Sequence, residues 1–212
     1  MGEGLRERKK RQTKQRISDV AVRLFVERGF DNVTIAEVAE AAEVSVNTVY
    51  NYFAAKEDLV LPPDEASPDR LAGIVRQRPP GQSAAAAVLA RLREEVRGRE
   101  RSVGLTPGFG PVLEMMRAAP TLAARLQDVG HQMTEALAAE LVAETGAAGD
   151  DPLPRVMAWH IGSLHSLVYA EIGRRTAAGE RADAIAAAVL ELLDVVEGVL
   201  GEQVLAYAVR EE

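Results

Sequence analysis

The residues with the most distinctive chemistry stand close together, between positions 46 and 51. Asn47, Thr48 and Asn51 carry amide and hydroxyl groups that both donate and accept hydrogen bonds, and Val46 offers methyl groups. Amides and hydroxyls pair with the base edges exposed in the major groove of DNA, and apolar groups contact the thymine methyl. These four residues are therefore the candidates for direct contacts with bases.

A second set of side chains suits phosphate oxygens, because hydroxyl and cationic groups donate hydrogen bonds to them. The set consists of Thr34, Ser45, Tyr50, Tyr52 and Lys56, together with Arg11 and Lys14 from a basic segment upstream. Contacts of this kind fix the position of a protein on a duplex without reading its sequence. Tyr52 is also expected to be at least partly buried.

Two short helices joined by a tight turn are predicted to hold these side chains. In the first, Thr34 and Glu37 fit a capping box, in which each side chain bonds to the backbone N–H of the other residue. The apolar residues that follow have the spacing of one buried helical face. They are Ile35, Val38, Ala39 and Ala42.

The second helix is predicted to run from Val46 to about Phe53. Ser45 precedes it and can cap its first turn. Val49 and Phe53 would then face inward, which leaves the polar residues between them on the outer surface. A short, polar helix of this kind fits the major groove of DNA.

An earlier helix, residues 13–28, is predicted from a continuous apolar stripe. Gly29 would end it, with Phe30 as an apolar plug behind the turn. The three helices together would enclose a small core that holds the outer surface of the last one rigid. That core is predicted to contain Leu24, Phe25, Ile35, Val38, Val49 and Phe53.

The charge of the chain is unevenly distributed. The net charge is -7, which taken alone argues against a nucleic-acid partner. Residues 1–16, however, hold seven basic side chains against two acidic ones, whereas residues 61–212 hold 15 basic and 22 acidic ones. A basic arm directly before two short helices indicates phosphate contacts, although a basic terminus can also be simply solvated.

Residues 13–60 closely resemble the DNA-binding part of the TetR family of bacterial transcriptional regulators. The resemblance is carried by LFVERGF at 24–30, TIAEVAEAA at 34–42, VSVNTVYNYF at 44–53 and KEDL at 56–59. It implies an all-α protein with an N-terminal three-helix helix-turn-helix DNA-binding domain and a larger C-terminal helical domain for ligand binding and dimerisation. The boundary is predicted at residue 61, which gives domains of 1–61 and 62–212.

The resemblance also implies roles for single residues and for the whole chain. At the matching positions Thr34, Tyr50 and Lys56 would grip the DNA backbone. Asn47 stands where the family has a small or basic residue, so the base preference does not carry over. The family resemblance implies a repressor that binds a palindromic operator as a homodimer and is released by a small molecule.

The rest of the chain is predicted to be helical, with about nine or ten helices in all and no strand pattern or internal repeat. A fourth helix would begin at 56–61 and be ended or kinked by Pro62 and Pro63. The glycine-rich stretch 104–111 lacks the ending of a phosphate-binding loop. The further helices are predicted at 67–78, 83–101, 111–118, 120–145, 152–176 and 181–207.

Two surfaces of the C-terminal half are predicted from residue type and helical spacing. A ligand pocket is assigned to Met115, Met116, Met133, Met157, Trp159, His160, Ser163 and Tyr169, for an uncharged or amphipathic effector, with Glu171 as a carboxylate that could meet a cation. A dimer interface is assigned to Leu167, Ile185, Val189, Leu192, Leu193, Val196, Val199 and Leu200. Both sets could also be plain core of a single chain.

Several classes of function have no support in the sequence. The chain contains no cysteine, and His160 and His165 are five residues apart, which is wrong for a metal pair on one helical face. Nucleophile elbows, His–Glu metal pairs and cofactor motifs are missing, so neither an enzyme nor a cofactor is expected. No secretory signal or membrane-spanning run is present, which predicts a cytoplasmic protein. A helical carrier with a purely structural helix-turn-helix is the alternative.

Overall fold

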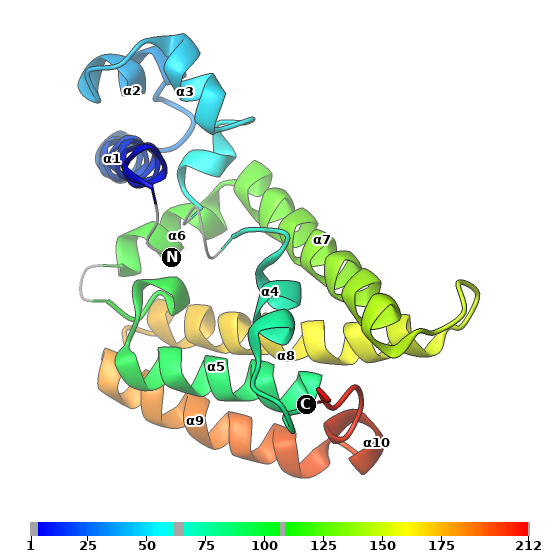
Figure 1. Ribbon diagram of the computed structural model, residues 1–212. Coiled ribbons are helices and arrows are strands. Elements are labelled where there is room, and N and C mark those ends of the chain that lie inside the picture. Colours follow the sequence, from blue (N-terminus) through cyan, green and yellow to red (C-terminus); the bar gives the residue numbers. More distant parts are fainter. Residues whose placement is uncertain (1–3, 62–65, 107–108, 212) are drawn as a thin grey trace. The chain divides into compact units, whose positions relative to one another are not determined.

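The computed structural model describes residues 4–61, 66–106 and 109–211, and in these ranges every regular element is a helix (Figure 1). Ten α-helices and two 3-10 helices are present in the described ranges, which confirms the predicted all-α class. The chain divides into two compact units. The first is Met1–Ala66 with Glu114–Leu126, and the second is Ser67–Leu113 with Gln127–Glu212. The functional boundary at residue 61 stays a prediction.

The first unit is built on helix α1, which packs against α2 and against the 3-10 helix η1, while α2 packs on α3. The bounds of these elements are α1 Leu5–Arg28, α2 Ile35–Ala41, α3 Val46–Tyr52 and η1 Glu57–Leu59. Of the predicted core, Leu24, Phe25, Val38, Val49 and Phe53 are buried, and Ile35 is half-buried. Phe30 completes this core, because its ring meets the ring of Phe25 edge-on at 5.0 Å.

Helix α1 begins at Leu5, eight residues before the predicted start. Residues 5–12 are leucine, arginine, glutamate, lysine and glutamine, all good helix formers, but they lack an apolar stripe. A prediction that depended on apolar spacing could not detect this part of the helix. The described part of the basic arm therefore forms the first turns of α1.

The predicted fourth helix at 56–61 is replaced by the short 3-10 helix η1. The side chain of Leu59 is buried, and so are those of Val60 and Leu61, which follow η1 directly. The burial of these three side chains holds the segment in place. Ser18 Oγ donates a hydrogen bond of 2.8 Å to the carbonyl oxygen of Leu59 and so ties η1 to α1. The predicted break at Pro62 and Pro63 lies outside the described residues.

In the second unit, α5 lies against α8 and α9, which also pack on each other (Figure 1). Helices α6 and α7 contribute residues to both units. The bounds are α4 Arg70–Gln77, α5 Ala84–Gly98, η2 Arg101–Val103, α6 Gly110–Ala118, α7 Pro120–Thr145, α8 Leu153–Ala177, α9 Ala182–Val199 and α10 Glu202–Leu205. The predicted helices up to residue 177 are confirmed to within a few residues.

The last predicted helix, 181–207, is wrong at its C-terminal end. Helix α9 stops at Val199, the short α10 follows, and the chain then turns back. Gly201 N-caps α10 in an extended conformation, which a continuous helix would not allow. The end of the chain instead bonds to residues 81–84, through Gly81 N to Arg210 O at 2.9 Å and Arg210 N to Gln82 O at 3.1 Å.

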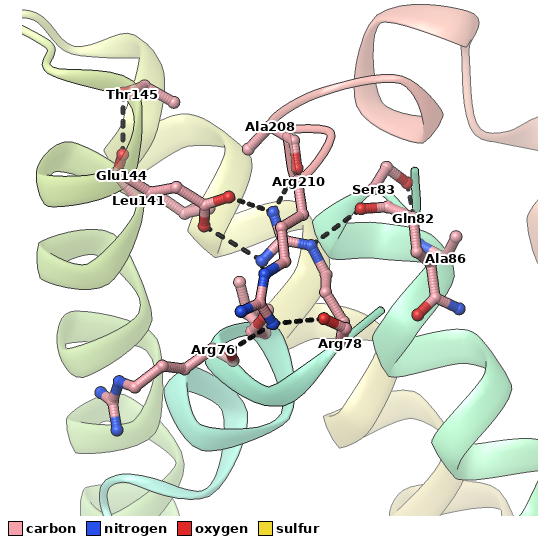
Figure 2. Close-up of polar contacts among 11 residues, drawn as sticks. Arg76, Arg78, Gln82, Ser83, Ala86, Leu141, Glu144, Thr145, Ala208 and Arg210 are labelled. Carbon is pink, nitrogen blue, oxygen red and sulfur yellow. Dashed lines mark hydrogen bonds and ion pairs between the residues drawn. The ribbon is translucent and has the colours of Figure 1, made fainter. Parts of the chain in front are cut away.

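The side chain of Arg78 holds the C-terminal segment against residues 78–82, and Figure 2 shows its contacts. The side chain is 3% exposed. Its guanidinium donates to the carbonyl oxygens of Gln82 at 2.8 Å and Ala208 at 2.6 Å, and it pairs with Glu144 of α7 through both terminal nitrogens. Arg210 adds hydrogen bonds to the carbonyl oxygens of Arg76 and Arg78. We call Arg78, Glu144 and residues 207–210 the C-terminal clasp.

Candidate nucleic-acid interface

Helix α3 is held at its start by the cap that the sequence predicts. Ser45 Oγ accepts a hydrogen bond of 3.0 Å from the backbone N–H of Thr48, and the two hydroxyls lie 2.8 Å apart. Val49 and Phe53 point into the core, so the helix cannot rotate without exposing them. The Thr48 hydroxyl is thus engaged within the protein, and its role as a base contact stays a prediction.

The outward face of α3 presents the polar set as expected. Val46, Asn47, Tyr50 and Asn51 are all exposed, and their spacing places them on one side of the helix. Tyr50, with 53% of its surface exposed, projects furthest from the core among the tyrosines of this helix. Tyr52 is half-buried, which confirms the expectation for it.

Thr34 caps α2 through the predicted capping box, which is confirmed in full. Its hydroxyl accepts from Glu37 N at 3.2 Å, and Glu37 Oε2 accepts from Thr34 N at 2.8 Å. Hydrogen bonds from the Thr34 backbone and then from its hydroxyl hold the pKa of Glu37 below its ordinary value. A phosphate contact from the Thr34 hydroxyl would have to share a group that already holds the helix start.

Lys56 has a structural role that its position in the sequence does not reveal. Its ammonium donates a hydrogen bond of 2.6 Å to the carbonyl oxygen of Phe30 and lies 4.4 Å from the centre of the Phe30 ring and 5.5 Å from that of Phe25. The side chain thereby ties the segment after α3 to the core beside α1. An ammonium has three donors, so a phosphate contact remains compatible with this bond.

Replacement of Lys56 by alanine is expected to act in two ways. The melting temperature should fall, because the Phe30 carbonyl and the two rings lose their cation. Binding to specific and random DNA should weaken alike, and the magnitude of the salt slope should fall by about 1 for each protomer that contacts the DNA. Thermal unfolding and anisotropy at several salt concentrations separate the two effects. An unchanged salt slope would limit Lys56 to positioning.

A groove of about 460 Å³ runs between the start of α1 and α3. It is lined by Arg6, Glu7, Lys9, Lys10, Thr13, Thr48, Asn51 and Tyr52. Arg6, Lys9, Lys10 and Thr13 have the i, i+3, i+4, i+7 spacing of one helical face, so the helix concentrates positive charge beside α3. Of the residues that the sequence assigned to bases or phosphates, only Thr48, Asn51 and Tyr52 line the groove, and Arg11 and Lys14 of the same helix α1 do not. Lys14 Nζ instead lies 5.8 Å from the centre of the Phe53 ring.

Sequence reasoning missed Arg6, Lys9 and Lys10 as individual contacts because it placed the helix start after them. Once residues 5–12 are read as helix, the spacing of the basic residues is the signal that finds them. Three cations, with a single carboxylate from Glu7, leave the groove with positive charge. A groove of this charge beside polar side chains suits a phosphate backbone next to base edges.

The predicted ligand pocket stays a prediction, because its residues are divided between the two units. Met115 and Met116 belong to the first unit, whereas the other predicted lining residues belong to the second. Trp159 is 63% exposed, and Ser163 is exposed with its hydroxyl bonded to the carbonyl oxygen of His160 at 2.7 Å. Met116, Met133 and Met157 are buried in core positions.

Glu171, the carboxylate that could meet a cation, already pairs with two arginines of its own helix. Arg174 and Arg175 both donate hydrogen bonds to it, at 2.6 Å and 2.7 Å. These bonds lower the pKa of Glu171 to about 2. Its charge is compensated within α8, so it offers little to a cationic ligand.

The predicted dimer residues fall into two groups. Ile185, Val189 and Leu193 are buried inside the single chain, so their assignment to a subunit interface is wrong. An apolar stripe does not tell whether it faces the same chain or another, and here α5 and α8 cover it. Leu167 and Val199 are exposed, and Leu192, Val196 and Leu200 are half-buried, so these five remain open to a second copy.

The described residues show neither a metal site nor a membrane-spanning helix. In the ranges 4–61, 66–106 and 109–211, no group of three or more histidine, aspartate or glutamate side chains is arranged to hold a metal ion. Across those same ranges, no helix combines the length and the apolar content needed to cross a bilayer.

A capped helix with an exposed polar face, held by a three-helix core beside a basic groove, defines a helix-turn-helix DNA-binding protein. Comparison with known proteins agrees. Residues 17–61 match the family model of bacterial regulatory proteins, tetR family. Over 158 residues the chain is 30% identical to the HTH-type transcriptional regulator TcmR of Streptomyces glaucescens, which covers 71% of this chain and 68% of TcmR.

The chain therefore belongs to the TetR family and is a DNA-binding transcriptional regulator. Over 47 residues it is 47% identical to the HTH-type transcriptional regulator LuxR of Vibrio harveyi, which covers 22% of this chain and 23% of LuxR. A solved structure of a putative TetR-family transcriptional regulator from Rhodococcus sp. has a TM-score of 0.50 at 21% identity, over 87% of this chain and 97% of that one. The last similarity shows the shared fold.

Proposed function

We propose that this regulator is a repressor that binds a palindromic operator as a homodimer and leaves it when a small molecule occupies the second unit. The observation that carries the proposal is the exposed polar face of α3 beside the basic groove of α1. The proposal includes a cytoplasmic location, where the protein has direct access to bacterial DNA. Val46, Asn47, Thr48 and Asn51 are assigned to bases.

The proposed phosphate contacts flank the exposed polar face of α3. They are assigned to Thr34, Ser45, Tyr50, Tyr52 and Lys56, to Arg11 and Lys14, and to the groove residues Arg6, Lys9 and Lys10. Hydrogen bonds to phosphates set the register of the helix, so that its side chains meet the same bases in every complex.

Replacement of Asn47 by alanine is expected to relax base choice at one position in each half-site, at a cost of roughly 1–3 kcal/mol on the preferred base. The side chain is exposed, so the fold should be unaffected. Competition binding with all single-base variants of the operator measures the preference. Asn47→Ala with an unchanged preference profile would remove Asn47 from the base contacts.

A dimer is proposed because one short helix makes too few contacts for specific binding, and two-fold related helices reach successive turns of the major groove. Helices α8 and α9 pack side by side, and each exposes large apolar side chains. On α8 these are Leu153, Val156, Trp159 and Leu167, and on α9 they are Val195 and Val199. Val195 and Val199 are 62% and 79% exposed, an unusual position for valine that a second copy of the pair would cover.

The substitutions Val195→Glu and Val199→Glu together are expected to convert the dimer to a monomer and to abolish tight operator binding. Both side chains are exposed, so the fold of the chain should persist. Sedimentation velocity gives the oligomeric state, and Val26→Glu, which adds a charge at an exposed apolar position of α1, is the matched control. A double variant that stays dimeric would place the interface elsewhere.

Repression itself is tested with a reporter gene behind the DNA upstream of the protein's own gene. Expression of the regulator is expected to lower reporter output, and the Asn47→Ala variant should lower it less. An increase of output with the wild-type protein would make it an activator.

A further inference from the structure

The second unit contains a partly buried polar cluster, in which Ser102 is buried and His165 and Tyr169 are half-buried. The cluster joins Ser102 of η2 to His165 and Tyr169 of α8. The Tyr169 hydroxyl donates a hydrogen bond of 2.8 Å to the carbonyl oxygen of Ser102. The imidazole of His165 lies against the Tyr169 ring, with ring centres 4.4 Å apart and planes tilted by 30°.

A buried ion pair borders the cluster. Arg70 Nη2 donates to both carboxylate oxygens of Glu95 at 2.7 Å, and Arg91 Nε donates to Oε1 at 2.8 Å. The Glu95 side chain has no exposed surface. Its charge is thus already compensated by two arginines, and the Arg70 charge is directed toward it.

Two polar atoms in the cluster lack a partner. Ser102 Oγ and His165 Nε2 are both buried and make no hydrogen bond to any described residue. Buried polar atoms are almost always paired, because an unpaired one has lost its water without replacement. Two such atoms next to the same tyrosine leave a donor and an acceptor free to hydrogen-bond a bound molecule.

The chemistry of His165 restricts what that partner is. Burial, with a smaller effect of the Arg70 charge, lowers the pKa of His165 to about 4. The imidazole is therefore neutral at physiological pH, and it neither attracts an anion nor repels a neutral molecule. A carboxylate would find no uncommitted cation here, since Arg70 already pairs with Glu95, and a cation would meet the Arg70 charge.

The surroundings along α8 are apolar. Ile161 and Val168 lie four residues before and three residues after His165, on the same helical face, and both are buried. Ser102 sits on a 3-10 helix of only three residues, which can move at lower cost than α5 or α8. Movement of η2 is the simplest way to open space beside His165.

We infer that the effector is an uncharged, largely apolar molecule with a hydroxyl or carbonyl group, and that Ser102 and His165 hold this group. The inference rests on the proposed release by a small molecule and supplies the chemistry of that ligand. The site on η2 and α8 has only Tyr169 in common with the pocket residues assigned from the sequence.

The test uses the whole chain and three related probes: 2-naphthol, naphthalene without the hydroxyl, and 2-naphthoate with a charge. 2-Naphthol is expected to raise the melting temperature of the wild type more than either relative does. In the variant with Ser102→Ala and His165→Phe, the shift with 2-naphthol should fall to less than half and match that with naphthalene. An equal shift in wild type and variant, a larger shift with 2-naphthoate, or no shift with 2-naphthol would overturn the inference.

The two single variants, Ser102→Ala and His165→Phe, give a second test, in which the melting temperature is measured without ligand. Because the two polar atoms are unpaired, the apolar replacements should leave the melting temperature of the ligand-free protein unchanged or higher. A clear fall in both single variants would mean that partners within the chain use these atoms, which would overturn the inference. Neither measurement involves DNA, so the ligand site and the proposed release are tested separately. A protein that binds 2-naphthol through Ser102 and His165 but remains bound to DNA would contradict the proposed release, and the ligand site would still be supported.

Discussion

Replacement of Arg78 by alanine is expected to lower the free energy of unfolding by about 3 kcal/mol or more. Arg78 is 3% exposed and joins three distant parts of the chain: residues 75–82, Glu144 of α7, and Ala208 near the C-terminus. Alanine would remove one donor from each of three backbone carbonyls, those of Val75, Gln82 and Ala208, and the paired guanidinium from Glu144. Urea unfolding of the two proteins measures the difference.

Arg76 provides the matched control for this prediction. It lies two residues away and also forms ion pairs, with Glu140 at 2.7 Å and Asp69 at 3.2 Å, but half of its side chain is exposed. Ion pairs at the surface contribute little, so Arg76→Ala should cost less than about 1 kcal/mol. If the two variants lost equal stability, or if Arg78→Ala lost less than Arg76→Ala, the C-terminal clasp would not hold the unit together.

Replacement of both Lys9 and Lys10 by glutamine is expected to reduce the magnitude of the salt slope of DNA binding by about 3 to 4. Each neutralised phosphate contributes about 0.9 to the slope, and a dimer would lose four such contacts. Both lysines line the groove beside α3, and glutamine is a good helix former, so α1 should remain intact. Anisotropy titrations over a range of salt concentrations give the slope.

The control for the lysine variant changes the same net charge elsewhere. Arg97 and Arg181 are exposed in the second unit, and their replacement by glutamine should leave the slope unchanged. A similar reduction in this control would mean that total charge, rather than the groove of α1, governs the salt dependence.

Features determined by neighbouring residues could be predicted from the sequence. The capping box of Thr34 and Glu37, the cap at Ser45 and the start of α5 after Ser83 all depend on partners within three residues. The outward face of α3 could be predicted because Val49 and Phe53 are four residues apart, which puts both on the buried face of a helix and leaves the polar residues on the other face. These local rules were sufficient for the fold class and for the candidate base contacts.

Features that depend on distant residues could not be predicted in this way. Arg78 and Glu144 are 66 residues apart, and the chain end meets residues 81–84 only after folding, so the end of α9 was misplaced. The bond of Lys56 to Phe30 spans 26 residues. Likewise, the apolar stripe of α9 showed that Ile185 and Val189 are buried somewhere, but not that α5 and α8 bury them.

The most direct test of this protein as a sequence-reading regulator is fluorescence anisotropy on duplexes that tile the DNA upstream of its own gene, at two salt concentrations. We expect tight binding to one fragment, with two protomers per fragment and an affinity that falls steeply as salt is raised. Absent binding, or equal binding to every fragment, would contradict sequence reading by α3 on this DNA and would favour a helical carrier whose helix-turn-helix is only structural.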